Sequence, residues 1–293
     1  MQILGIDLGS SSIKIAVFDD SKQKTLARAF FPEKELPIEV PKPDWAEQHP
    51  DVWWNSLKGA LHKIKDQITL KNIQAIGISY QMHGLVAIDK NLTPVRPAII
   101  WCDSRAVKIG EKAFGALKDQ YYMDHHLNAP GNFTASKLAW IKEKEPEIYA
   151  RIWKFMLPGD YLALKLSGKV TTTEAGLSEG ALWDFKNKMI SAELMDHYEF
   201  SETLIPEIVP SVGLQCHVSK WAAEELGLTP NIPITYRAGD QPNNALSLGV
   251  LNPGELATTA GTSAVIYGVT DTPLYDTKSR VNTFLHVNNT LKN

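Results

Sequence analysis

The feature that most constrains the fold is a series of three short apolar runs within the first 31 residues. The runs cover Ile3 to Leu8, Ile13 to Phe18 and Thr25 to Phe31, and turn residues at 9–12 and 19–22 separate them. Apolar runs of this length between turn residues are typical of strands rather than helices. Because the connections are so short, the strands are expected to pair as an antiparallel meander.

The rest of the chain alternates helical and strand patterns. After a proline-rich connector over 32–43, Pro50 precedes apolar residues from Trp53 to Ile68 that recur on one helical face. Further strands are predicted over 73–79, 85–88, 98–101, 234–237, 255–259 and 264–269, and helices over 104–118, 134–151, 160–167, 191–198 and 219–227. Strands and helices mixed in this order predict an α/β protein.

Composition excludes several classes of protein. The chain has 293 residues, a net charge of −3 and a hydrophobic fraction of 44%, and this composition is ordinary for a folded globular protein. The small net charge argues against general binding to nucleic acid or to an anionic membrane. No apolar run approaches the about 20 residues of a membrane-spanning helix. The two cysteines, Cys102 and Cys216, form no CxxC pair, which predicts a reducing, cytoplasmic compartment.

Two turns that combine glycine with hydroxyl residues are candidates for phosphate binding. Gly9, Ser10 and Ser11 lie between the first two predicted strands, and Gly261, Thr262 and Ser263 lie between the last two. Glycine lets the backbone approach a ligand closely, and such a turn can present its N–H groups to an anion. Two of these turns could hold a polyphosphate from opposite sides. The alternative is that both are plain β-hairpin turns.

Two carboxylates interrupt apolar segments at positions suited to chemistry. Asp7 lies just before the first turn, where one carboxylate with phosphates and waters would suit Mg²⁺. Asp240 follows the strand over 234–237 and begins a helix that has Pro242 just inside, so the helix N-terminus should keep it ionised. An ionised Asp240 could accept the proton of an attacking hydroxyl. The alternatives are a structural role for Asp7 and a helix-capping role for Asp240.

Other polar and aromatic clusters are weaker signals. Gln81, Met82, His83 and Gly84 follow a predicted strand, where polar groups can line a ligand site, and His83 could donate to a sugar hydroxyl. The His125–His126 pair has no carboxylate or cysteine at metal-ligand spacing, so no metal site is predicted there. The remaining clusters are interpreted structurally: Trp45, Trp53 and Trp54 as core, and Asp103 with Arg105 as an internal ion pair that fixes the loop over 101–105.

Taken together, these motifs resemble the FGGY carbohydrate kinases, a branch of the actin-like ATPase superfamily. The resemblance rests on the segment from Gly5 to Lys14, on Trp45-Ala46-Glu47-Gln48 with Trp53-Trp54, on Trp101 to Arg105, on Gly239-Asp240-Gln241 and on Gly261-Thr262-Ser263, all in the family's order. It implies an actin-like ATPase (ribonuclease H-like) fold with a mixed sheet and flanking helices. The loop Gln81-Met82-His83-Gly84 looks like the xylulokinase version of the family's sugar-site loop.

The resemblance also implies roles for individual residues. Asp240 matches the catalytic base that takes the proton from a sugar hydroxyl, on C5 in xylulokinases, as it attacks the γ-phosphoryl group of ATP. Asp7 matches the acid near Mg²⁺, and the ATP-binding positions are Gly9, Ser10, Ser11, Lys14, Gly261, Thr262 and Ser263. The sugar-binding positions are Gln81, Met82, His83 and Gln241. A cytoplasmic kinase with sugar and ATP as its ligands, and with a homodimer as its possible assembly, is the expected function.

Two departures from the family pattern leave alternatives open. Many xylulokinases carry Asn after the base, whereas this chain has Gln241, as glycerol-kinase-like relatives do. The chain is also shorter than family members, which implies a sugar-binding domain over 1–248 and only the start of a nucleotide-binding domain over 249–293. The alternatives are a kinase for glycerol, ribulose or gluconate, an actin-like ATPase without a sugar substrate, and a sugar-binding fragment without turnover.

Overall fold

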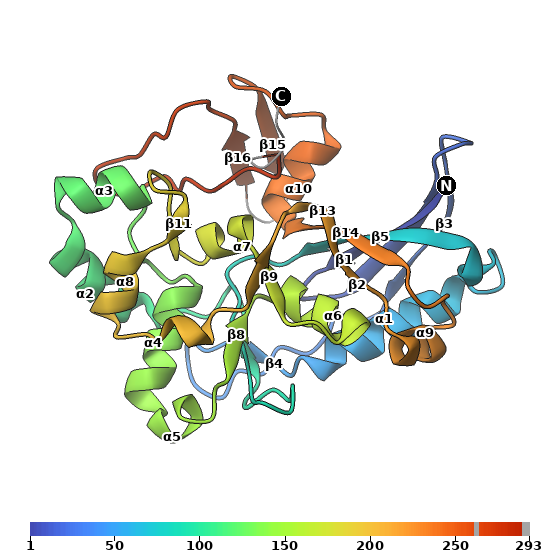
Figure 1. The fold of residues 1–293 in the computed structure, drawn as a ribbon, viewed down its shortest axis with the longest axis horizontal. Helices are drawn as coiled ribbons and strands as arrows, with labels where there is room; N and C mark the ends of the chain where they lie inside the picture. Colours follow the sequence, from blue (N-terminus) through green and yellow to red (C-terminus); the bar gives the residue numbers. More distant parts are fainter. Residues whose placement is uncertain (261–263, 289–293) are drawn as a thin grey trace.

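A six-stranded sheet, called the central sheet below, lies on the right side of Figure 1 in the computed structural model, which describes residues 1–260 and 264–288. Its strand order is β13-β14-β5-β1-β2-β3. The strands are β1 (Gln2–Leu8), β2 (Ile13–Asp19), β3 (Lys24–Phe31), β5 (Ile73–Tyr80), β13 (Val212–His217) and β14 (Pro233–Gly239). β1, β2 and β3 form the predicted antiparallel meander, whereas β5 runs parallel to both β1 and β14. The sheet is therefore mixed, as predicted.

Ten shorter strands form two-stranded sheets in the described part of the chain. The pairs are β4 (Glu47–Gln48) with β7 (Ala98–Ile99), β6 (Val86–Ile88) with β8 (Lys154–Met156), β9 (Thr171–Thr173) with β12 (Glu207–Val209), β10 (Trp183–Asp184) with β11 (Met189–Ile190), and β15 (Leu256–Ala260) with β16 (Ala264–Gly268). The β15–β16 hairpin has its own small core beside α10 (Asp240–Ser247), apart from the central sheet.

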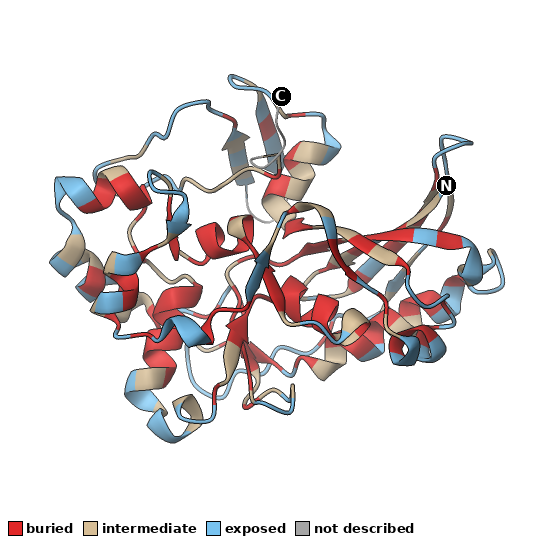
Figure 2. Ribbon diagram, viewed as in Figure 1, coloured by how far each residue is buried: buried red, intermediate tan, exposed pale blue. Residues whose placement is uncertain are grey.

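Helices flank the sheet and build a second lobe. α1 (Asp51–Ile64), α6 (Pro158–Ser167) and α9 (Lys220–Leu226) share one apolar core with the central strands. The other helices are α2 (Val107–Leu117), α3 (Gln120–His126), α4 (Thr134–Lys144), α5 (Pro146–Tyr149), α7 (Glu174–Glu179) and α8 (Ala192–His197), with 3₁₀ turns at Leu70–Asn72 and Glu202–Leu204. A second core lies among α2, α4, α7 and α8. Figure 2 shows buried residues concentrated in the sheet and in the helix faces that cover it.

The sequence of α1 explains both its position and its end. Trp53, Leu57, Leu61 and Ile64 are buried on one face, as the helical spacing predicts. The helix ends at Ile64 and not at Ile68, and it is followed by a turn in which the Gln67 and Ile68 N–H groups both donate to the Ile64 carbonyl. Ile68 still packs against the core from outside the helix. The apolar pattern thus predicts burial correctly but overextends the helix by one turn.

Helix boundaries elsewhere depend on caps and on proline. The predicted helix over 134–151 is divided into α4 and α5, because Pro146 cannot continue a helix and disfavours helical backbone at Glu145. α3 and α7, with seven and six residues, were not predicted. Both are started by side chains, Asp119 and Thr173, that accept from backbone N–H groups.

None of the helices within residues 1–260 and 264–288 is both long and apolar enough to cross a bilayer.

Candidate active site

Three parallel strands bring the predicted site residues to one edge of the central sheet. In the register of the sheet, Leu8 of β1 and Gly239 of β14 both pair with Tyr80 of β5. The chain segments that follow these strands therefore leave the sheet side by side. A crevice outside the carboxyl ends of parallel strands is where α/β proteins bind ligands. The sequence alone could not show this convergence, because it depends on pairing between distant strands.

The first of these segments is the turn that contains Gly9, Ser10 and Ser11. The Gly9 N–H donates to the Ser12 carbonyl at 3.1 Å, and this bond closes the β1–β2 hairpin. Neighbouring segments support the turn, since the Trp101 indole N–H donates to Ser10 Oγ at 3.2 Å and the Gln48 amide donates to the Ser10 carbonyl at 2.7 Å. The turn is thus held in place while its hydroxyl groups remain at or near the surface.

Asp7 and Lys14 face each other across the same hairpin. Their side chains pair across β1 and β2, with Lys14 Nζ 3.2 Å from Asp7 Oδ2. The side chains are 38% exposed for Asp7 and 62% exposed for Lys14, so solvent screens the pair. A half-exposed carboxylate beside a turn with hydroxyl groups near the surface suits Mg²⁺, which takes one or two carboxylates together with waters and phosphates. The donor set here fits that ion, and Asp7 would be its protein ligand.

The second segment is the loop over 81–84, which is packed far more tightly. Gln81 and Met82 are buried, and the Gln81 N–H donates to the Leu8 carbonyl at 2.8 Å. The Gln81 amide nitrogen lies 3.5 Å from Gln48 Oε1, whereas Gln81 Oε1 has no hydrogen-bond partner among the described residues. A buried amide oxygen without a partner costs stability, and a ligand hydroxyl could satisfy it.

His83 is held by hydrogen bonds at three points of the residue. Its backbone N–H donates to Glu179 Oε1 at 3.2 Å, its carbonyl accepts from Lys137 Nζ at 2.7 Å, and its Nδ1 lies 2.9 Å from the Glu179 carbonyl. These contacts stabilise a left-handed backbone, with φ of 59°, that a histidine adopts infrequently. The imidazole is therefore oriented before any ligand arrives.

The same contacts define which hydrogen bond His83 can offer a ligand. A carbonyl oxygen only accepts, so Nδ1 must carry the hydrogen that is directed at the Glu179 carbonyl. Burial lowers the pKa of His83 to about 4, so the ring is neutral at pH 7 and Nε2 has a free electron pair. His83 can then accept from a ligand hydroxyl at Nε2. The sequence-based hypothesis that it donates to a sugar hydroxyl is not supported by this geometry.

Lys137 and Glu179 were missed by the sequence analysis. Lys137 lies on α4 and is fully buried, and its Nζ donates to the carbonyls of His83 and Ile100. Burial lowers its pKa to about 7, and burial raises that of Glu179 well above its usual value. Lysine and glutamate are almost never fully buried unless they have partners. Neither residue lies in a local sequence motif from which its role could be predicted.

Asp240 begins α10, directly after the edge residue Gly239. Its pKa is raised to about 6, first by burial and then by the negative charge of Asp7. The sequence-based interpretation considered only the helix N-terminus, which favours the ionised form, and did not anticipate the opposing effects of burial and of Asp7. The carboxylate is nevertheless mostly ionised at pH 7, as predicted. The repulsion also indicates that Asp7 and Asp240 lie close enough to interact.

Gly239 allows the base and the loop over 81–84 to approach each other. A Cβ atom at this position would lie 2.4 Å from Met82 Cγ and 2.7 Å from Glu179 Oε2. Real Cβ atoms do not come so close to other atoms, so any larger residue would push the loop or Glu179 away. The strand that carries Asp240 thus packs directly against Met82.

The remaining candidates differ in how well they are placed. Gln241 lies in the first turn of α10, next to Asp240, and is half-buried. Gly261, Thr262 and Ser263 lie outside the described residues, between β15 and β16.

A buried ion pair braces β14 below the site. Arg237 on β14 and Asp160 on α6 are fully buried, with Nε and Oδ1 2.8 Å apart. Arg237 also donates to Thr171 Oγ1 at 3.2 Å. Removing one partner of such a pair leaves an uncompensated buried charge. The pair therefore ties the strand that positions Asp240 to α6.

The predicted structural role of the loop over 101–105 is confirmed. Arg105 pairs with Asp103 at 2.6 Å, and both side chains are buried. Asp103 also accepts from the Ala46 N–H at 2.6 Å, so the loop is joined to the segment after Trp45. Trp53 and Trp54 are core residues, as predicted, whereas Trp45 belongs to the second lobe and packs edge-on against Trp140.

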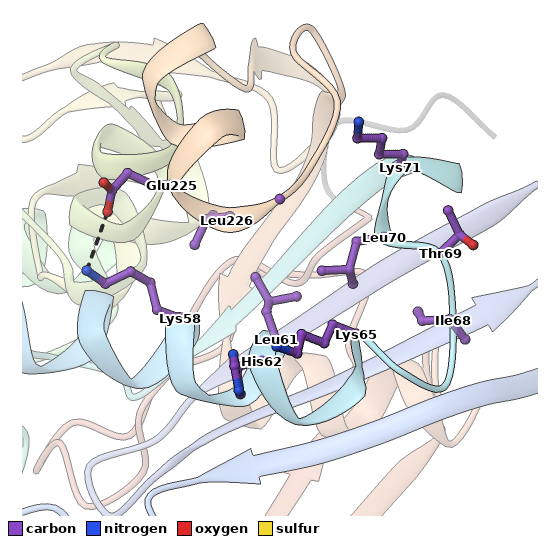
Figure 3. Close-up of a pocket in the computed structure, with 11 residues that line it drawn as sticks. Lys58, Leu61, His62, Lys65, Ile68, Thr69, Leu70, Lys71, Glu225 and Leu226 are labelled. Atoms are coloured by element: carbon purple, nitrogen blue, oxygen red, sulfur yellow. Dashed lines mark hydrogen bonds and ion pairs between the residues drawn. The ribbon is translucent and has the colours of Figure 1, made fainter.

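A hollow at the opposite end of the sheet contains none of the candidate residues (Figure 3). It has a volume of about 490 Å³ and is lined by Lys58, Leu61, His62, Lys65, Ile68, Thr69, Leu70, Lys71, Glu225, Leu226 and Gly227. Residues 69–71 precede the first residue of β5, whereas the candidate site follows its last one. An eight-residue strand separates the two places by roughly 25 Å. The hollow is thus distinct from the candidate site.

The topology and the edge residues define a class of protein. A β1–β2–β3 meander continues into parallel β5 and β14, with a glycine–hydroxyl turn after β1 and an acid after β14, and this is the actin-like ATPase fold. The chain belongs to the FGGY family of carbohydrate kinases, since the model of that family's N-terminal domain matches residues 2–247.

Individual relatives agree with this assignment. The chain is 28% identical over 284 residues to a xylulose kinase of Escherichia coli (strain K12) and 32% identical over 286 residues to a xylulose kinase of Lactococcus lactis subsp. lactis (strain IL1403), covering 97% of this chain in both cases. A crystal structure of a xyloylose kinase from Brucella ovis covers 98% of this chain with a TM-score of 0.88 and 29% identity. A xylulose kinase structure from Rhodospirillum rubrum has a TM-score of 0.90 at 22% identity, which supports the fold.

The chain spans little more than half the length of these relatives. It covers 57% of the Escherichia coli protein, 56% of the Lactococcus lactis protein and 58% of each of the two crystal structures. The matched part contains the edge residues that follow β1, β5 and β14.

Proposed function

We propose that the complete protein is an ATP-dependent kinase that phosphorylates D-xylulose to D-xylulose 5-phosphate. The observation that carries this proposal is the Asp240 carboxylate, which has a pKa of about 6 and stands at the same sheet edge as the Gly9–Ser11 turn and the loop over 81–84. The family and the xylulose kinase relatives support the choice of sugar.

In the proposed reaction Asp240 is the catalytic base. It accepts the proton of the sugar C5 hydroxyl while that oxygen forms a bond to the γ-phosphorus of ATP. The bond from this phosphorus to the bridging oxygen breaks, and ADP leaves. A base with a pKa just below the working pH is ionised yet basic enough to take a proton, a role that contributes typically about 10²–10⁴-fold to the rate.

The phosphates are assigned to the open side of the edge. Gly9, Ser10 and Ser11 would approach the phosphate oxygens, and Lys14 would exchange its exposed contact with Asp7 for one with a phosphate. Gly261, Thr262 and Ser263 are assigned to a second phosphate turn by the resemblance alone. Mg²⁺, held through Asp7, would neutralise phosphate charge when it is bound with ATP.

The sugar is assigned to the packed side of the edge. His83 accepts from a sugar hydroxyl at Nε2, and Met82 supplies an apolar wall next to Gly239. Gln81 and Gln241 supply amide groups, of which Gln81 Oε1 has no other partner among the described residues. A site that leaves a buried acceptor unpaired strongly rejects an analogue without the matching hydroxyl.

The division of labour along the chain is part of the proposal. Residues 1–248 would form the sugar-binding domain, and residues 249–293 would begin the nucleotide-binding domain. The complete enzyme is proposed to act in the cytoplasm, and a homodimer is its proposed assembly. Size-exclusion chromatography with light scattering would test the dimer.

The test of function has two parts. ADP release by the complete kinase should be fastest with D-xylulose in a panel that includes glycerol, ribulose and gluconate. A clear preference for another member of the panel would change the proposed substrate but not the proposed kinase activity. ATP hydrolysis at a rate that no sugar changes would favour an ATPase. Calorimetry on the 293-residue chain should detect D-xylulose binding without turnover.

A further inference from the structure

A cluster of three potential metal ligands lies in the second lobe, outside the candidate active site. His126 ends α3, Asp184 ends β10 and Glu193 lies in α8, so the three residues come from separate elements. One ligand atom from each lies within 4.8 Å of the others. His126 and Asp184 are almost fully buried, at 4% and 2% exposure. The carboxylates that were missing from the sequence around the two histidines are thus supplied by distant segments.

The hydrogen bonding of His126 leaves one of its ring nitrogens without a partner. His126 Nδ1 lies 3.0 Å from the Tyr122 carbonyl, which only accepts, so Nδ1 carries the hydrogen. In the neutral ring Nε2 then has a free electron pair. This atom lies 3.4 Å from Glu193 Oε2, and neither atom has a hydrogen-bond partner among the described residues. Two buried electron-pair donors therefore face each other with no hydrogen between them.

A positive charge is needed between these two atoms, and it can be either a proton or a metal ion. The distance between the atoms distinguishes the two. A proton shared in a charge-assisted N–H···O bond would draw the atoms to about 2.7–2.9 Å. Two ligands bound about 2.1 Å from one tetrahedral ion lie about 3.4 Å apart, which is the observed separation.

The surroundings hold the ligands in place. Asp184 accepts from His125 Nδ1 at 2.9 Å, from the Asn187 side chain and from two backbone N–H groups. The Tyr122 ring stacks on His126 with centroids 4.3 Å apart. Metal sites commonly depend on such outer contacts to orient their ligands.

We propose that His126, Glu193 and Asp184 bind one divalent transition-metal cation of the zinc class. Neutral imidazole with two carboxylates suits Zn²⁺ or Co²⁺, whereas Mg²⁺ prefers oxygen ligands alone. The ion balances the two carboxylate charges and links α3, α8 and the β10–β11 hairpin. His126 and Glu193 are the principal ligands, and Asp184, which already accepts four hydrogen bonds, is the weaker third ligand.

The experiment uses the untagged 293-residue chain with Cys102→Ser, because Cys102 is exposed and could itself bind metal. After chelator treatment and dialysis, the chain is titrated with Zn²⁺ in a calorimeter and with Co²⁺ in a visible spectrometer. One Zn²⁺ should bind per chain, and bound Co²⁺ should give the intense visible bands of a four-coordinate ion. The variants Glu193→Gln and His126→Gln should each weaken binding at least about tenfold, as loss of a metal contact commonly does.

A matched control is His197→Gln, which removes another histidine of the same helix as Glu193 without touching the cluster. It should leave the titration unchanged. Glu193→Gln keeps the shape of its residue, so its far-ultraviolet spectrum should match the parent and exclude misfolding as the cause. The proposal is overturned if the parent binds neither metal, or if binding is unaffected by Glu193→Gln. Because activity is not measured, the result is independent of the proposed kinase function.

Discussion

The two sides of the sheet edge are built differently. On the side of His83, the loop is held by the buried groups of Lys137 and Glu179, which contact it at several points. On the side of the Gly9–Ser11 turn, the charged pair of Asp7 and Lys14 is substantially exposed. The contrast teaches that the proposed sugar side is organised before ligand binding, whereas the proposed phosphate side keeps its charged groups free to exchange partners.

The largest effect is expected from Asp240→Asn in the complete kinase. The amide cannot accept the hydroxyl proton, so kcat should fall by about 10²–10⁴-fold. D-xylulose binding should remain within a few-fold, because the variant keeps the shape next to Gly239. Steady-state kinetics and calorimetry would measure the two quantities. Turnover close to that of the parent would remove Asp240 as the base.

The next largest effect is expected on sugar affinity, from a comparison of the buried Lys137 with the exposed Lys14. Lys137→Met leaves the carbonyls of His83 and Ile100 without their donor, which costs roughly 1–3 kcal/mol for each buried group. D-xylulose affinity of the 293-residue chain should fall at least about tenfold, and the free energy of unfolding should fall as well. Lys14→Met is the control on the other side and should change sugar affinity less than about twofold. Equal effects would abolish the distinction between the sides.

A smaller effect is expected from pH. Asp240 must be ionised to act, and its pKa of about 6 predicts that kcat/KM of the complete kinase rises with pH and levels off above 7, with about a tenfold deficit at pH 5. Sugar affinity should not follow this curve, because the pKa of His83 is about 4 and its ring stays neutral. Measurements of kcat/KM and of the D-xylulose Kd across pH 5–8 would separate the two. A flat kcat/KM profile would contradict the assignment.

The smallest effect is expected for the stability of the open side. Lys14→Met removes an exposed ion pair, and such pairs contribute about 0–1 kcal/mol. Denaturation in urea should therefore show a change in unfolding free energy within that range. A loss of several kcal/mol would mean that Asp7 and Lys14 brace the hairpin structurally, and the two sides would then be alike.

Local patterns predicted many of the elements, although not α3, α7 or β13, and they did not predict the contacts between distant elements. The β1–β2–β3 meander, the buried face of α1 and the position of Asp240 at a helix start all followed from short stretches of sequence. Lys137 and Glu179 could not be found in this way, because their partners at 83 and 100 are 37 to 96 residues away. The raised pKa of Asp240 likewise depends on burial by the fold and on the charge of Asp7.

The register of β1, β5 and β14 has a consequence for how the chain can change length. Because Leu8 and Gly239 both pair with Tyr80, the register of the three strands fixes the relative positions of the candidate residues that follow them. An inserted or deleted residue within any of these strands would rotate its successors to the opposite sheet face. The turn over 20–23 connects β2 to β3 and lies outside these three strands, so a change in its length would not shift their register. Tags, spacers and natural length variation belong at sites of that kind.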